Sequence, residues 1–255
     1  MQIGVARHRR ERCESFHWAT AFTRVTMPVR IGKHRTRDHG RTLRRLRLTG
    51  SGSVPVEAAL TLVGAHYQVI GETVLRDVAC NPDVFKVNPL GQVPALVLSG
   101  GEVMTESAAI LIWLADRYPH ALLAPSPTDK RRPAFLRWMA YISSAIYGLA
   151  WVRGDPMRLV SDERQAEVAL NRIANRRADC WRWMDAQIEP CRFLLGDELG
   201  VLDLYVATVS RWSPRRTRFY REAPKMAEIV RRVDADPRLA ELWAARFPFF
   251  EGWEG

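Results

Sequence analysis

The chain has 255 residues, of which 47% are hydrophobic and 26% charged, and its formal net charge is +10 at pH 7. This length is enough for one large or two modest domains with real cores, and the composition is that of an ordinary globular protein. Because no apolar run approaches the ~18 to 20 residues that a membrane-spanning helix needs, we expect no membrane partner.

The positive charge is concentrated at the N-terminus. Residues 1–47 contain 13 Lys and Arg against 3 Asp and Glu, which leaves 25 residues of each sign in the rest of the chain. A charge confined to one end supports a basic arm and not a nucleic-acid-binding face, so we expect no nucleic-acid partner for the folded body. Residues 1–42 show little periodicity, and we expect a disordered extension or a mis-called start, with Met27 as an internal alternative.

Cysteine and histidine usage argues against several kinds of site. The four cysteines are scattered, without the spacing of a zinc site or a redox pair. We therefore expect the protein to be located in the reducing cytoplasm and to bind no metal. Four of the six histidines lie in the first 40 residues, which leaves only His66 and His120 for the folded body. Both stand near predicted helix ends, so general-base catalysis by histidine is not expected.

The predicted elements begin with a strand over residues 43–49, although its three arginines are poor occupants of a strand covered on both faces. A mostly buried helix follows over residues 54–64, and Ser53 is a good N-cap for it. A second strand over residues 65–70 completes a β-α-β unit.

A Pro- and Gly-rich loop that turns into a short strand covers residues 88–98, and a second strand then leads to Glu106 and Ser107, which open a helix. Pro94 cannot donate to a sheet ladder. If its bond to Val93 is cis, the Val93 backbone faces outward and can pair with an extended peptide. The helix start suits a ligand carboxylate and Glu106 suits an ammonium, so the segment fits a small zwitterionic peptide.

After a linker at residues 124–128 only helical patterns remain. The predicted helices cover residues 131–150, 161–188 and 201–212. The last of these is apolar on nearly all sides, which is typical of a helix in the middle of a helical domain. Asp203 stands three residues after Gly200, so it supplies half of a capping box and is predicted to be a folding residue.

The segments Gln92-Val93-Pro94-Ala95-Leu96 and Glu106-Ser107-Ala108-Ala109-Ile110 resemble the glutathione S-transferase family, of the bacterial type with a serine in the first-helix loop. The resemblance implies an α/β thioredoxin-like N-terminal domain over residues 43–123 and an all-α C-terminal domain over residues 128–255. It also implies a cytoplasmic homodimer.

The resemblance further implies glutathione as co-substrate in the detoxification of a small hydrophobic electrophile. Val93 and Pro94 would lie beside the cysteinyl backbone of glutathione, and Glu106 and Ser107 would bind its γ-glutamyl end. No metal or other cofactor is implied.

The catalytic residue is expected at the N-terminus of the first helix, where a hydroxyl and the helix dipole lower a thiol pKa. The family places a Tyr, Ser or Cys there, and this chain offers Ser53 and, as the second candidate, Ser51. The alternative role of Ser53 is a pure N-cap, and that of Ser51 is a turn. A thiol-disulfide oxidoreductase is disfavoured because that turn holds no cysteine.

The walls of the electrophile site are expected on the helical domain, at Trp138 and Tyr141 and also at Ile142 and Tyr147, with core packing as the alternative. The second functional hypothesis is a glutathione transferase-like binding or scaffold protein without catalysis. The arginines of the first predicted strand favour it.

Overall fold

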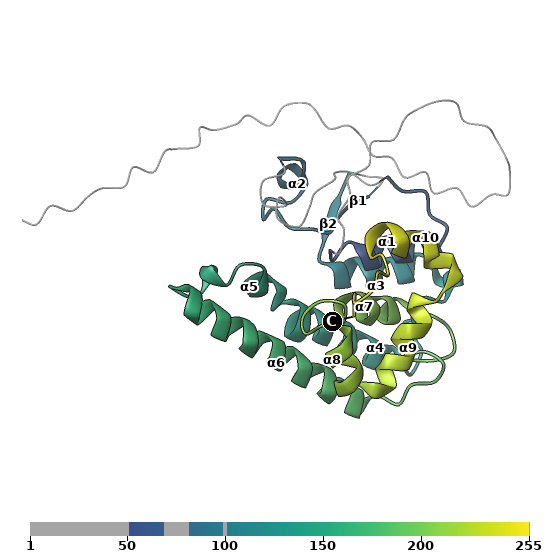
Figure 1. Cartoon of the computed structure of the whole chain (residues 1–255). Coiled ribbons are helices and arrows are strands. Elements are labelled where there is room, and N and C mark those ends of the chain that lie inside the picture. Colours follow the sequence, from purple (N-terminus) through teal and green to yellow (C-terminus); the bar gives the residue numbers. More distant parts are fainter. Residues whose placement is uncertain (1–50, 69–81, 99–100, 255) are drawn as a thin grey trace, which may run out of the picture.

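The computed structural model describes residues 51–68, 82–98 and 101–254. The basic arm and the strand predicted over residues 43–49 lie outside these ranges, as does the end of the strand predicted over residues 65–70. Residues 65–68 belong to neither a helix nor a strand. In Figure 1 a small sheet lies on one side of the first helices, and most of the later helices lie on the other.

The first helix, α1 (Val54–Leu62), forms where it was predicted and is buried along most of its length. It packs against α3 (Ser107–Arg117) and α7 (Val201–Val209), which belong to the two halves of the chain. Its small and branched side chains allow that close approach, and Val54, Ala58 and Ala59 are fully buried. The helix is therefore an interface element between the N-terminal and C-terminal parts.

The predicted hairpin forms from β1 (Ala95–Val97) and β2 (Val103–Thr105), which are antiparallel and follow the short helix α2 (Pro82–Val87). Ala95 pairs with Thr105, so the residues just before β1 and just after β2 lie at the same end of the hairpin. The Val93–Pro94 peptide bond at that end is cis, as the sequence interpretation required.

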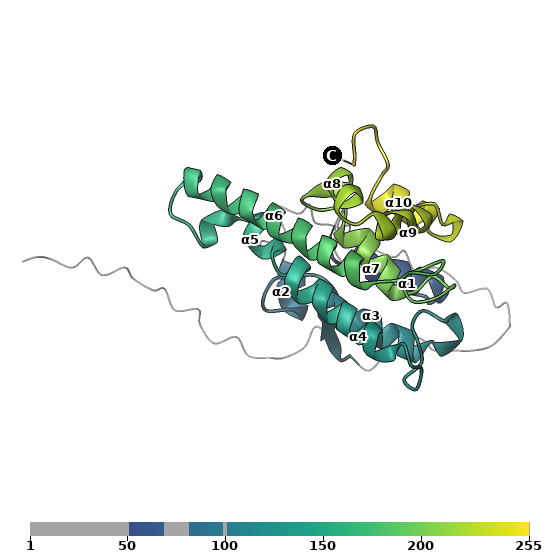
Figure 2. The same ribbon diagram turned by 90° about the horizontal axis from the view of Figure 1, so that it is seen from below.

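The part after the linker is helical, as predicted. Its longer helices lie side by side or cross in the bundle of Figure 2, with α4 running along α6 and α5 beside one end of α6. The elements are α4 (Arg132–Tyr141), the π-helix η3 (Ile142–Tyr147), α5 (Ala150–Gly154), η4 (Pro156–Arg158), α6 (Glu163–Gln187), α7, α8 (Arg215–Glu222), α9 (Pro224–Asp234), η5 (Pro237–Leu239) and α10 (Ala240–Arg246). The short turn η2 (Pro119–Ala121) precedes them.

The single helix predicted over residues 131–150 is interrupted by η3, where the Gly148 N–H donates to the Ser143 carbonyl, five residues back. The fully buried Arg177 of α6 donates from Nε to the Ile146 carbonyl at 2.9 Å. A side chain that takes a helix carbonyl in this way competes with the ordinary ladder of hydrogen bonds. This contact joins two helices, so the periodicity of either helix alone does not predict it.

The central helix α7 has every residue buried, as its apolar composition predicted. Asp203 caps it by accepting from the Gly200 N–H at 2.8 Å and from the Leu194 N–H at 2.9 Å. A β-carbon on Gly200 would lie 2.8 Å from the Leu123 carbonyl oxygen, which explains why no serine or threonine stands at that cap. Asp203 is therefore the folding residue that the sequence indicated. It supplies its half of the capping box, and Gly200 has no side chain to supply the other half.

Candidate functional site

The turn before α1 brings the two predicted serines together. Ser51 Oγ and Ser53 Oγ lie 2.6 Å apart, and the Ser53 N–H donates to Ser51 Oγ at 3.3 Å. Ser51 is buried, whereas Ser53 is partly exposed. Two hydroxyls share one hydrogen in such a pair, so one hydrogen is left for a ligand.

Ser53 occupies the N-cap position, but its side chain accepts no hydrogen bond from the helix backbone. Its backbone is helical (φ −78°, ψ −21°), whereas a capping serine is usually extended. Pro55 stands at the second helical position, so one of the two N–H groups that such a cap serves does not exist. These features leave the Ser53 hydroxyl free of the capping role that was its alternative.

Glu106 and Ser107 mark the junction of β2 and α3. Glu106 is exposed and has φ 65° and ψ 104°, a conformation that L-residues other than glycine rarely adopt. Such strain costs on the order of 1–3 kcal/mol and is concentrated at functional positions. Because Pro94 precedes β1 and Glu106 follows β2, the hairpin register places both at the start of α3.

Two tyrosines of the helical part contact the N-terminal ends of α1 and α3. The Tyr205 hydroxyl of α7 lies 3.0 Å from Ser107 Oγ in a buried hydrogen bond. Tyr147, at the end of η3, lies against Gly52 in the serine turn. The two tyrosine rings are 6.3 Å apart between centroids, so one aromatic pair spans from the start of α1 to the start of α3.

The tyrosines are held in their neutral, hydrogen-donating form. Burial raises the pKa of Tyr205 to about 12, against the opposing hydrogen bonds from Ser107 and Ser143. Burial also raises the pKa of Tyr147 well above its usual value, and the charges of Tyr205 and Glu106 add to this effect. The negative charge of Glu106 raises the pKa of Tyr205 as well.

The remaining predicted site residues lie at the start of the hairpin and on α4. Val93 is partly exposed and Pro94 is buried at the start of the hairpin. Trp138 is 2% exposed and packs edge-on against Trp183 of α6, and the Tyr141 hydroxyl donates to the Cys180 carbonyl at 3.2 Å. The recorded contacts of Trp138 and Tyr141 are thus with α6 and not with the serine turn, which favours the packing alternative for both.

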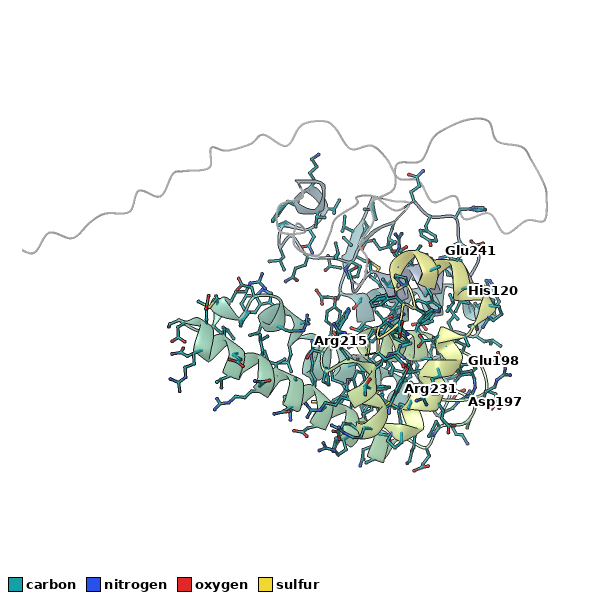
Figure 3. All side chains as sticks on the ribbon, in the orientation of Figure 1. His120, Asp197, Glu198, Arg215, Arg231 and Glu241 are labelled. Carbon is teal, nitrogen blue, oxygen red and sulfur yellow. The ribbon has the colours of Figure 1, made fainter. Side chains whose placement is uncertain are left out.

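The histidines of the folded body are exposed, as expected. His66 follows α1, and His120 lies in η2 at the edge of the molecule in the view of Figure 3. Within the described ranges, His, Cys, Asp and Glu side chains form no group of three or more that could hold a metal ion. Neither histidine has a recorded contact with the serine turn.

Comparison with known proteins identifies the family. The family model for the glutathione S-transferase N-terminal domain matches residues 53–117. The zeta-class glutathione S-transferase of Euphorbia esula is 30% identical over 179 residues, which cover 66% of this chain and 76% of the relative. The chain belongs to the glutathione S-transferase family. The uncharacterized GST-like protein YncG of Escherichia coli K12 is 29% identical over 194 residues, covering 76% of this chain and 93% of that protein.

The fold of the family is shared as well. The structure of a glutathione transferase homologue from Sulfitobacter, solved with bound glutathione, is similar to this one, with a TM-score of 0.65 and 24% sequence identity. The match covers 76% of this chain and 93% of the homologue's chain. The predicted architecture, a thioredoxin-like N-terminal domain followed by a helical C-terminal domain, is therefore confirmed. In the described ranges, no helix is long and apolar enough to cross a bilayer.

The sequence analysis did not identify Tyr205 as a site residue, and it placed Tyr147 only among the expected walls of the electrophile site. Both tyrosines stand in strongly apolar helical segments, where an aromatic residue reads as core. The signal in the sequence for the Tyr147 contact was Gly52, between Ser51 and Ser53, because a glycine often marks a close approach by another group. It does not say which group approaches.

Proposed function

We propose that the chain is a glutathione transferase in which the Ser53 hydroxyl stabilises the thiolate of glutathione for attack on a small hydrophobic electrophile. The observation that carries this proposal is the convergence of two helix starts on one tyrosine pair: Tyr147 at the turn before α1, and Tyr205 at Ser107 of α3. Helix N-termini attract anions, and glutathione carries a thiol and carboxylates that need such positions.

The hairpin end supplies the complementary groups for the peptide. In this proposal the first N–H groups of α3 bind the γ-glutamyl carboxylate, and the Glu106 carboxylate binds the ammonium beside it. The Val93 backbone, adjoining the cis bond to Pro94, pairs with the cysteinyl unit as an added strand would. The Sulfitobacter homologue with bound glutathione supports this choice of ligand.

The chemistry follows from the paired hydroxyls. When Ser51 donates to Ser53 Oγ, the Ser53 hydrogen is left to donate to sulfur, and the chain of two hydrogen bonds strengthens that donation. The thiol proton leaves to solvent. The sulfur then forms a bond to the electrophilic carbon, and the bond from that carbon to its leaving group breaks with the electron pair going to the leaving group.

A homodimer in the cytoplasm remains our expectation. At the face that α4 and α6 share, Trp183 is 44% exposed and the Arg137 guanidinium lies over its ring. Exposed apolar groups with a polar rim are typical of an interface between subunits. Sedimentation of the Trp183→Glu variant tests this face, because a dimer through it would dissociate.

The test of the proposed function is the Ser53→Ala variant, with the exposed Ser126→Ala as control. Loss of a hydrogen bond to a charged sulfur should lower kcat for a chromogenic electrophile by about tenfold or more at pH 7, with glutathione affinity within about twofold. Equal loss of turnover and affinity would contradict the role. A parent chain that binds glutathione but turns over no electrophile would favour the binding-protein hypothesis instead.

A further inference from the structure

A tyrosine from the helical half of the chain reaches the serine turn. A β-carbon built on Gly52 would lie 1.8 Å from the Tyr147 hydroxyl oxygen and 2.7 Å from the ring carbon that bears it. No side chain larger than hydrogen fits there while the tyrosine stays in place. The glycine between the two serines is therefore the space that the Tyr147 hydroxyl occupies.

We propose that Tyr147 is a second catalytic hydroxyl, which donates a hydrogen bond to the glutathione sulfur in addition to the one from Ser53. This inference rests on the proposed function and deepens it, because it assigns a residue of the C-terminal part to the thiol site. The serine pair leaves one hydrogen for a ligand, so a thiolate gains from a second donor.

The hydroxyl is available for this role. Among the described residues it makes no hydrogen bond, whereas Tyr205 is engaged by Ser107. Tyr147 is partly exposed, so a hydroxyl that has no protein partner beside the serine turn can donate to a ligand. Burial keeps the pKa of Tyr147 above its usual value, with Tyr205 and Glu106 adding to the rise and Arg177 opposing it, so the group is protonated and can donate at neutral pH.

The position of the ring is determined by its surroundings. Tyr147 ends the π-helix η3, and single π-helical turns are frequent at functional sites because they re-aim a side chain. Its ring packs against Trp212 at 4.8 Å and against Tyr205 at 6.3 Å between centroids. These contacts leave the hydroxyl end as the part that faces Gly52.

Arg177 is the positioning residue for this arrangement. It is fully buried and bonds only to carbonyls in the described part of the chain, Nε to Ile146 at 2.9 Å and Nη1 to Ser213 at 3.1 Å. Its Nη2 has no partner among the described residues. Burial lowers the pKa of Arg177 to about 10, so the guanidinium remains charged at neutral pH and places a positive charge near the tyrosine. A buried cation is costly, and here it holds the peptide unit next to Tyr147.

The experiment measures the ionisation of bound glutathione in the full chain, by the ultraviolet absorbance of the thiolate as a function of pH. Tyr147→Phe keeps the ring and removes the hydroxyl, and should raise the apparent pKa of the bound thiol by about one unit with the affinity for glutathione nearly unchanged. Tyr118→Phe, at the opposite end of α3 from Ser107, is the matched control and should leave the pKa unchanged.

The outcomes separate the two proposals. A rise in thiol pKa for both Tyr147→Phe and Ser53→Ala supports the second hydroxyl. A rise for Ser53→Ala alone overturns the role of Tyr147 and leaves the proposed function standing. No rise for either variant, or no glutathione binding by the parent chain, overturns both.

Discussion

Arg246 donates from Nε and Nη2 to a single carboxylate oxygen of Glu57, at 2.8 Å and 2.7 Å, and so joins the last helix to the first. Both side chains are buried, at 7% and 8% exposure. Burial raises the pKa of Glu57, and the hydrogen bond and charge of Arg246 oppose that rise. The pair holds α1, and with it the Ser51 and Ser53 turn, against the C-terminal part.

Removing one member of this pair should be more harmful than removing both. Arg246→Met leaves a buried carboxylate without its partner and should lower the free energy of unfolding by about 3–5 kcal/mol. The double variant Glu57→Gln, Arg246→Met should lose less. Urea unfolding of the two single variants and the double variant checks this, and additive losses would contradict the coupling.

The buried carboxyl of Asp203 should make stability depend on pH. Burial raises its pKa from 3.8 to about 7, against the lowering by the backbone N–H groups that it accepts from. Between these values the folded state holds a proton that the unfolded state has lost, so the stabilisation is greatest below pH 4 and is lost as pH rises through about 7.

Asp203→Asn removes this titration. The stability advantage of the parent over Asp203→Asn should therefore shrink by about 2 kcal/mol between pH 5 and pH 7, as measured by urea unfolding at both pH values. The subtraction cancels contributions that the two proteins share. A difference that stays constant across this range would show that the carboxyl is ionised throughout.

The contact between Gly52 and Tyr147 should appear as coupling between their substitutions. Gly52→Ala places a methyl group against the tyrosine hydroxyl and should cost about 1–3 kcal/mol of stability, as overpacking does. In a Tyr147→Ala background the same change should cost much less. Gly154→Ala is the control, because its β-carbon would meet nothing closer than 4.0 Å.

Glutathione affinity should depend on the strained residue Glu106. Glu106→Gln removes the charge that we assign to the ammonium, and should weaken binding by about tenfold or more. Glu102→Gln, an exposed glutamate just before β2, should leave binding unchanged. Equal affinities for Glu106→Gln and the parent chain would remove Glu106 from the site.

The sequence was most informative where the signal is local. The hairpin after Pro94 and the helix that opens at Ser107 follow from loop, strand and cap patterns within twenty residues of each other, whereas the cis bond at Pro94 entered the sequence interpretation only as a condition and is shown by the structure. The nearly all-apolar composition of α7 likewise predicted its central place, and the burial of every one of its residues confirms this.

The site itself depended on contacts that no local pattern contains. Tyr147 meets Gly52, and Arg177 donates to the Ile146 carbonyl in η3, which interrupts the helix that periodicity predicted. The capping alternative for Ser53 also depended on backbone angles, since a serine at that position caps only when its own backbone is extended. These relationships join residues from distant helices, so they emerge only after the fold is known.

The most direct test of the account is a calorimetric titration of glutathione into the full-length chain. We predict saturable binding with a stoichiometry near one per chain, since each chain contains one Glu106, Ser107 and Ser53 arrangement. Absence of any heat of binding, in a sample shown by circular dichroism to be folded, would contradict the proposed glutathione site.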